Sequence, residues 1–129
     1  MIAPPPEAET KLETERNIWV ASVRPDGRPH LAPVWFAWHA GKLYVCTEPG
    51  SVKARNISQN RRVVLALEDG THPVICEGIA APVLAPWSEV AEVAAKVAAV
   101  FRNKYDWDIS SEEQYTQLLE VTPTKWLAW

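Results

Sequence analysis

The turn-forming segment 24–29 constrains the fold of this chain more than any other stretch. It reads Arg-Pro-Asp-Gly-Arg-Pro, in which a proline presets φ for a turn and Asp-Gly supplies residues that tolerate positive φ. The segments on either side, 17–23 (NIWVASV) and 30–38 (HLAPVWFAW), are rich in β-branched and aromatic residues. This pattern predicts a β-hairpin.

Proline also marks the second strand of this hairpin. Pro33 removes one hydrogen-bond donor, so the strand at 30–38 should lie at a sheet edge or contain a bulge. Apolar runs separated by turn residues predict four further strands, at 42–47, 62–68, 73–83 and 115–129. Gly78 is a candidate bulge, and Pro123 should break the last strand.

Three segments have the character of helices. In segment 87–105 apolar residues recur at spacings of three and four, which predicts an amphipathic helix. Segment 51–59 favours a short helix with Ser51 as its N-cap. The polar segment 7–15 favours another short helix, preceded by a loose lead-in at residues 1–6 that contains three prolines.

The order of these elements predicts the fold class. Strands that follow one another as hairpins, without the spacing of βαβ units, indicate an antiparallel sheet. Six strands and one covering helix predict a mainly β fold, a small closed or split barrel with short additional helices. A length of 129 residues suits one domain, spanning 1–129, with no room for a separate catalytic domain.

Composition argues against several classes of function. The net charge is -3 and the 13 basic residues are dispersed, so nucleic acid is not an expected partner. The N-terminus lacks a secretory signal and no apolar stretch is long enough to span a bilayer, which predicts a cytoplasmic protein without a membrane partner. Cys46 and Cys76 lie in apolar runs without metal-ligand spacing, which predicts two buried thiols and no metal site.

Seven tryptophans are unusual in a chain of this length. Indole rings supply large apolar areas and are frequent at interfaces. Two interpretations stay open at this point. The rings fill the core of a small barrel, or some of them line a planar ligand or a contact between subunits.

The segment 47–56, Thr-Glu-Pro-Gly-Ser-Val-Lys-Ala-Arg-Asn, has the chemistry of a phosphate site. Thr47 ends a strand, Ser51 opens a helix, and Lys53 and Arg55 follow in the first turn. A helix start offers unpaired N–H groups and the positive end of the dipole, while hydroxyls and cations add donors and charge. The alternative is that Ser51 only caps the helix and the cations face solvent.

The motifs of the chain, taken in order, resemble a known family. R-P-D-G-R-P-H, P-V-W-F, T-E-P-G-S-V-K-A-R-N, R-V-V-L-A-L-E-D-G and C-E-G-I-A follow one another across 17–83, and P-T-K-W lies near the end. In this order and spacing the chain resembles the pyridoxamine 5′-phosphate oxidase-like superfamily of flavin-binding split barrels. The resemblance implies a six-stranded Greek-key barrel that forms a homodimer with two cofactor sites between the subunits.

The resemblance also implies the residues of each site. Those that would meet the edge of the isoalloxazine ring are Ala32, Pro33, Val34 and Trp35. Those that would hold the phosphate are Thr47, Ser51 and Lys53, together with Arg55. Those that would close the site from the other subunit are Lys125 and Trp126.

The chain departs from the family members that oxidise pyridoxamine phosphate. Val52 stands where those enzymes carry an arginine, and Ala32 stands where they carry a basic phosphate ligand, so that activity is not expected. Relatives with the K-A-R-N pattern use the deazaflavin coenzyme F-420, so both FMN and F-420 remain candidate cofactors. The substrate is a small molecule that the sequence does not identify.

Two functions remain open. The first is an oxidoreductase that transfers hydride between FMN or F-420 and a small substrate. The second is a non-catalytic flavin- or haem-binding storage protein with the same barrel. Hydride chemistry belongs to the cofactor and no nucleophile motif is present, so no catalytic side chain is expected. His30 is a candidate flavin contact or axial haem ligand.

Overall fold

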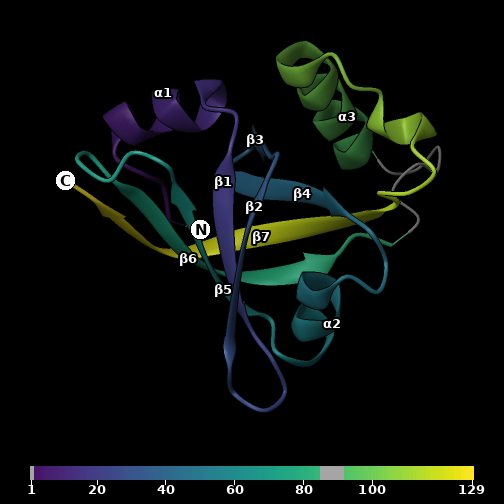
Figure 1. Ribbon diagram of the computed structural model, residues 1–129. Coiled ribbons are helices and arrows are strands. Elements are labelled where there is room, and N and C mark those ends of the chain that lie inside the picture. Colours follow the sequence, from purple (N-terminus) through teal and green to yellow (C-terminus); the bar gives the residue numbers. More distant parts are fainter. Residues whose placement is uncertain (1, 85–91) are drawn as a thin grey trace.

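Seven antiparallel strands form a single sheet in the computed structural model, which describes residues 2–84 and 92–129. The sheet order is β2-β1-β5-β6-β7-β4-β3, and Figure 1 shows that the sheet is strongly curled. The strands are β1 (Ile18–Val23), β2 (Pro29–Val34), β3 (Ala37–His39), β4 (Lys42–Thr47), β5 (Arg62–Leu67), β6 (Val74–Pro82) and β7 (Gln117–Ala128). The expected mainly β, antiparallel split barrel is confirmed.

The expectation of six strands is wrong, because the segment 30–38 forms two strands. β2 ends at Val34 and β3 begins at Ala37. Between them, the backbone N–H of Phe36 donates to the Tyr105 hydroxyl at 3.0 Å, and its carbonyl accepts from Lys104 at 3.2 Å. These groups of Phe36 therefore bond to a helix instead of a neighbouring strand. The break lies two residues after Pro33, in the segment where the proline predicted an edge or a bulge.

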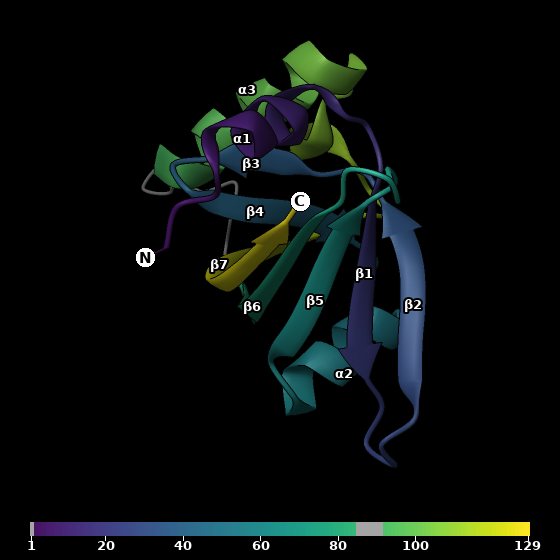
Figure 2. The same ribbon diagram turned by 90° about the vertical axis from the view of Figure 1, so that its left-hand side faces the viewer.

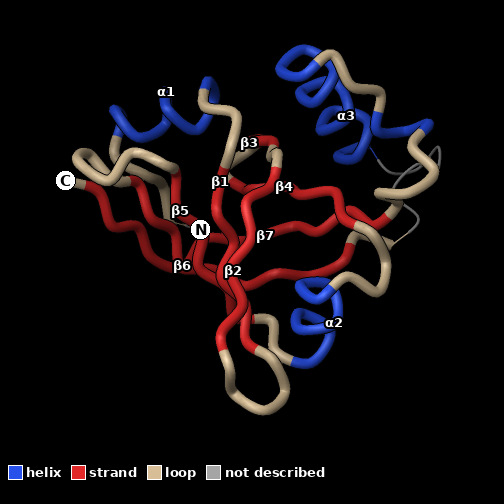
Figure 3. Tube along the Cα trace, viewed as in Figure 1, coloured by secondary structure: helices blue, strands red, loops and turns tan. Residues whose placement is uncertain are grey.

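The predicted hairpin is present and places β2 at an edge of the sheet. β1 pairs with β2 from Ile18 opposite Val34 to Val23 opposite Pro29. Gly27 takes the left-handed conformation that the tight turn requires, with φ of +89°. Figure 3 shows the loop of this hairpin extending beyond the rest of the sheet.

Curling of the sheet encloses one apolar core. Alternate residues of the strands point inward, as expected for strands with one buried face. The buried residues of this core include Ile18, Val20, Leu43, Val45, Val63, Leu65, Cys76, Leu119 and Val121. Both cysteines are free and buried, as the sequence predicted.

Three α-helices cover different parts of the curled sheet. α1 (Pro6–Thr14) and α2 (Val52–Gln59) lie at opposite ends of it, as Figures 1 and 2 show. Each buries apolar residues in the inner core, Ala8 and Leu12 from α1 and Ile57 from α2. They therefore close the two ends of the barrel.

The third helix, α3 (Glu92–Tyr105), covers the outer face of β3, β4 and β7. It buries Ala94, Val97 and Phe101 against a second apolar cluster that includes Tyr44 and Leu118. The amphipathic helix expected at 87–105 is therefore confirmed from Glu92 onward, and its first part lies outside the described residues. A short 3-10 helix, η1 (Ile109–Ser111), follows. No helix among the described residues is long and apolar enough to cross a bilayer.

The β6–β7 ladder contains the irregularity that the sequence predicted near Gly78. Gly78 lies opposite Pro123, and Glu77 lies opposite Lys125, so Thr124 is an extra residue on β7. The Thr124 hydroxyl donates to the Glu77 carbonyl at 3.1 Å. The expectation that Pro123 breaks the last strand is wrong, because the bulge absorbs the proline and β7 continues to Ala128.

Candidate functional site

A cavity of about 580 Å³ lies where the end of β2 meets β4, α2 and the segment after α3. Nine residues from segments far apart in the sequence line it. They are Asn17, Pro33, Val34, Trp35, Cys46, Lys53, Trp107, Glu112 and Tyr115. Its size is within the range typical of sites for small molecules and cofactors.

One wall of the cavity is the end of an edge strand. Pro33 and Val34 end β2, and Trp35 follows them. β2 pairs only with β1 among the described strands, so about half of its backbone groups point away from any ladder partner. Ala32 precedes this wall on the same strand, opposite Val20. The predicted ring-contacting residues are therefore adjacent, and three of the four line the cavity.

The predicted hydroxyl groups lie at the start of α2, before Lys53 in the chain, but neither Thr47 nor Ser51 lines the cavity. Thr47 ends β4 and is buried, and its Oγ1 lies 3.0 Å from Oγ of Ser51. Ser51 caps α2, because its Oγ accepts a hydrogen bond from the backbone N–H of Ala54 at 3.3 Å. If Thr47 donates to Ser51, the Ser51 proton is free for an anion. The N-cap role and the phosphate role are therefore compatible.

The start of α2 also leaves backbone donors available. The first amides of a helix have no acceptor within the helix. The amide of Ala54 bonds to the Ser51 side chain, and that of Arg55 bonds to the Ser51 carbonyl at 2.9 Å. The backbone bonds of the described residues use neither the Val52 nor the Lys53 amide.

Lys53 is a half-buried cation on the wall of the cavity. Burial lowers the pKa of Lys53, and the negative charge of Glu48 opposes that change. Among the described residues, no carboxylate lies within 4.0 Å of the Lys53 amine. A half-buried charge without a close partner is unfavourable, and an anion in the cavity would relieve that cost.

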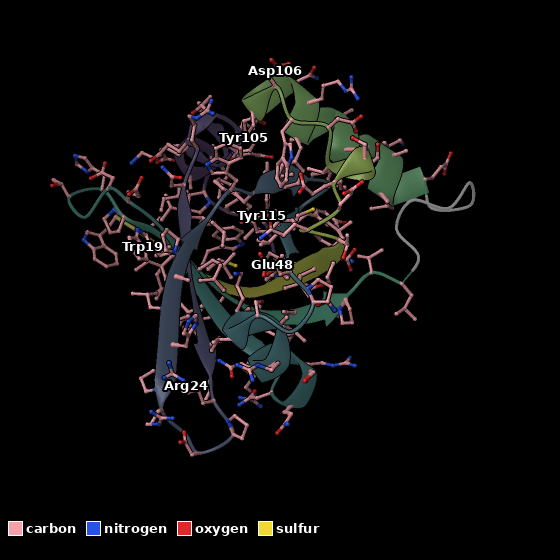
Figure 4. All side chains as sticks on the ribbon, turned by 45° about the vertical axis from the view of Figure 1, so that its right-hand side comes forward. Trp19, Arg24, Glu48, Tyr105, Asp106 and Tyr115 are labelled. Carbon is pink, nitrogen blue, oxygen red and sulfur yellow. The ribbon has the colours of Figure 1, made fainter. Side chains whose placement is uncertain are left out.

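An aromatic stack holds Trp35 against the cavity. Its ring lies parallel to that of Tyr105, with centroids 4.5 Å apart and an interplanar angle of 8°. The Tyr105 hydroxyl donates to the carbonyl of Arg16 at 2.7 Å and accepts from the amide of Phe36. Figure 4 shows Tyr105, Tyr115 and Glu48 following one another down this side of the molecule. α3 therefore fixes the orientation of a ring that lines the cavity.

Lys104 lies next to the Tyr105 ring of this stack, and its pKa is strongly lowered. Its amine is 3.5 Å from the centroid of the Phe36 ring. The pKa of Lys104 is lowered to about 8, mainly by burial and also by the charge of Arg16, while the charge of Glu15 opposes the change. The folded state therefore favours the neutral amine more than the unfolded chain does.

The lowered pKa of Lys104 predicts that the free energy of unfolding depends on pH in the alkaline range. Between about pH 8 and the unfolded pKa of 10.5, the folded protein binds fewer protons at Lys104 than the unfolded chain. The contribution of Lys104 to the free energy of unfolding should therefore rise across this window. Urea unfolding of the wild type and of Lys104→Met at several pH values measures this contribution. The tyrosines and cysteines also titrate in this range, but they do so in both proteins, so their effect cancels in the difference between the two free energies of unfolding. Parallel curves would contradict the prediction.

Other predicted residues lie away from the cavity in a single chain. Arg55 lines a separate hollow of about 490 Å³ on the other side of α2, together with Arg24 and Arg28 of the hairpin. Lys125 is exposed on β7, opposite Glu77. The Trp126 indole donates to the carbonyl of Ile2 at 3.0 Å, so β7 holds the lead-in segment in place.

His30 lies on β2 opposite Ser22 and does not line the cavity. Its Nδ1 is buried and has no hydrogen-bond partner among residues 2–84 and 92–129. Burial lowers the pKa of His30, and the charges of Arg24 and Lys53 lower it further. Folding therefore favours the neutral form of this side chain.

Comparison with a model of the pyridoxamine 5′-phosphate oxidase family gives a match over residues 4–129. The chain belongs to this family. The match covers nearly the whole sequence, so the strand, cavity and helix start described above all lie within the family domain. No curated protein sequence matches the chain significantly.

Solved structures share the fold of this family member. An F420 reductase is 24% identical over 92% of this chain and 94% of its own, with a TM-score of 0.69. HutZ, a haem storage protein from Vibrio cholerae, is 18% identical over 98% and 95%, with a TM-score of 0.77. An FAD-binding protein from Mesorhizobium loti is 19% identical over 95% and 91%, with a TM-score of 0.68. Proteins with this fold therefore include one named for F420, one for haem and one for a flavin.

Five residues of the cavity were not predicted from the sequence. They are Asn17, Cys46, Trp107, Glu112 and Tyr115. Trp107 carried a signal, because the excess of tryptophans suggested that some line a ligand. Glu112 lies in a polar segment without a recognisable motif. It could not be predicted because only folding brings it close to Cys46 of β4 and Lys53 of α2.

Proposed function

We propose that this family member binds a phosphorylated flavin or deazaflavin, FMN or F-420, in the cavity, where it exchanges hydride with a small substrate. The observation that carries the proposal is the Lys53 amine. It is half-buried, it has no close carboxylate among the described residues, and it lies on a cavity beside a capped helix start. These features together suit one terminal phosphate.

The residues of the cavity fit the two parts of such a cofactor. On the α2 side, Lys53 lines the cavity and supplies charge, and the Ser51 hydroxyl and the amides of Val52 and Lys53 at the start of the same helix are the proposed additional donors for a phosphate. On the β2 side, Trp35 offers a flat ring held rigid by Tyr105, and the β2 edge offers free backbone groups. The residues therefore match an anionic tail joined to a planar ring.

The roles of the protein are to bind, to orient and to exclude water. A bound flavin or deazaflavin supplies the hydride chemistry itself. Lys53 neutralises the phosphate, the β2 edge fixes the ring edge, and Trp35 covers the ring from water. No side-chain acid or base is assigned, because hydride transfer does not require one.

A homodimer is part of the proposal. β2 lies at the sheet edge, and its Leu31 is 61% exposed. A second copy would cover such an apolar edge, and its Lys125 and Trp126 would complete each site. We expect a dimer at micromolar concentration in sedimentation experiments, and a monomer that still binds cofactor with full affinity would contradict the shared site.

A non-catalytic haem-binding protein is the alternative, since HutZ shares the fold. Iron in haem commonly takes a histidine ligand. His30 is the histidine on β2, but the described lining of the cavity contains no histidine. Within one chain, the cavity therefore suits a flavin better than a haem.

Titration of the purified protein with three ligands tests the proposal. FMN, F-420 and haemin are added separately, and binding is followed by the absorbance and fluorescence of each ligand. We expect saturable binding of FMN or F-420 with one site per chain, and oxidation or reduction of the bound ring by a suitable donor or acceptor. Binding of haemin alone would support the storage protein instead.

A further inference from the structure

Glu112 places a fixed carboxylate on the wall of the cavity. It directly follows η1, where its backbone N–H bonds to the carbonyl of Ile109 at 3.3 Å. The indole N–H of Trp107 donates to Oε2 of Glu112 at 3.0 Å, and the backbone N–H of Gln114 donates to Oε1 of Glu112 at 3.4 Å. The side chain is only partly exposed. Its carboxylate is therefore held in one position by the protein.

The charge of Glu112 acts on the inside of the cavity. Cys46 also lines the cavity, and its pKa is raised to about 12, first by burial and then by the charge of Glu112. Among the described residues, no lysine, arginine or histidine lies within 4.0 Å of this carboxylate. Within one chain, the described residues therefore leave this charge available to a ligand.

A second glutamate shows how this chain builds a purely structural carboxylate. Glu120 on β7 bonds to the Lys42 amine at 3.1 Å and to the Tyr44 hydroxyl at 2.9 Å. Its charge is thus neutralised within the fold. Glu112 is anchored by neutral donors only, which orient the carboxylate without cancelling its charge.

Aromatic rings flank Glu112 on the cavity wall. The Trp107 ring meets Trp35 edge-on at 5.7 Å and Tyr115 edge-on at 6.2 Å, and all three rings line the cavity. The face of an aromatic ring attracts both cations and apolar groups, and a nearby carboxylate strengthens the attraction for a cation. The wall therefore suits a flat group with a positive charge.

We propose that Glu112 is a specificity-determining residue, which selects substrates that carry a positive charge on a flat apolar ring. The inference rests on the proposed function, because it treats the cavity as the site of substrate and cofactor together. Lys53 would take the anionic end of the cofactor, and Glu112 would take the cationic part of the substrate. The two opposite charges would therefore orient the cofactor and the substrate within the cavity.

The test compares two small probes of nearly the same shape on protein loaded with FMN. 1-Methylnicotinamide carries a positive charge, and nicotinamide is neutral. Binding is followed by the NMR signal of the Trp107 indole N–H, which reports on the neighbourhood of Glu112. We expect the cation to bind the wild type at least about fivefold more tightly, a typical effect of one charge contact.

Two variants isolate the charge of Glu112. Glu112→Gln keeps an acceptor for the Trp107 indole and removes the charge, so the preference for the cation should disappear. Glu113→Gln removes the same charge from the exposed neighbouring residue and should keep the preference. Equal binding of the two probes to the wild type, or an unchanged preference in Glu112→Gln, would overturn the inference.

FMN affinity, measured on the same samples, separates this inference from the proposed function. Tight FMN binding without a cation preference overturns the role of Glu112 alone. A cation preference that depends on Glu112, in protein that binds neither FMN nor F-420, supports the role of Glu112 and overturns the flavin proposal.

Discussion

Lys53→Ala should weaken the binding of FMN by at least about tenfold. The substitution removes one charge-assisted contact to the phosphate, and such contacts contribute about 1.5–3 kcal/mol each. That free energy corresponds to roughly a 10- to 150-fold change in the dissociation constant. Fluorescence titration measures the constant directly. Because the amine is half-buried without a close carboxylate, we expect no loss of folding stability in the variant.

Two controls show whether the effect arises at the phosphate. Lys96→Ala makes the same change in net charge on the exposed surface of α3, and FMN affinity should not change. Riboflavin has the same ring without the phosphate, so Lys53→Ala should affect its binding little. An unchanged FMN dissociation constant in Lys53→Ala, or an equal loss for riboflavin, would remove Lys53 from the proposed phosphate site.

Gly78→Ala should destabilise the fold by about 1–3 kcal/mol, the usual cost of forcing extra volume into a packed region. A Cβ atom at Gly78 would lie 2.7 Å from Cγ1 of Val121 and 2.9 Å from the carbonyl oxygen of Thr122. The carbonyl belongs to the backbone of β7, directly across the bulge, and it moves only if the ladder moves. The free energy of unfolding from urea denaturation measures the effect.

Gly70→Ala provides a matched control for this substitution. Gly70 lies in the turn between β5 and β6, and a Cβ atom there would meet nothing within 4 Å. Its φ lies outside the left-handed region, so alanine is tolerated and stability should change by less than about 0.5 kcal/mol. Equal stability of Gly78→Ala and Gly70→Ala would show that the bulge widens to accept a methyl group.

The break between β2 and β3 shows where local reading of the sequence reaches its limit. The segment 30–38 has continuous strand propensity, and Pro33 was its only interruption. The strand ends because Tyr105 and Lys104, far along the chain, take the backbone groups of Phe36. Propensity cannot report a hydrogen bond to a residue about 70 positions away.

The candidate site divides in the same way. The segment that we propose to hold the phosphate could be identified from the sequence, because Thr47, Ser51 and Lys53 are close neighbours on a strand end and a helix start. Arg55 was grouped with them, but it faces the hollow beside Arg24 on the other side of α2. Two positions along a helix amount to more than half a turn, so Lys53 and Arg55 point in different directions.

The sequence by itself determined the features that depend on neighbours along the chain. These are the hairpin at Asp26-Gly27, the antiparallel order of the strands, the cap at Ser51 and the bulge at Gly78. Only the tertiary structure decided that Trp35, Lys53 and Glu112 line one cavity. The physical reason is that the curl of the sheet and the packing of α3 on its outer face bring these three residues together. Both features depend on contacts between residues distant in the sequence.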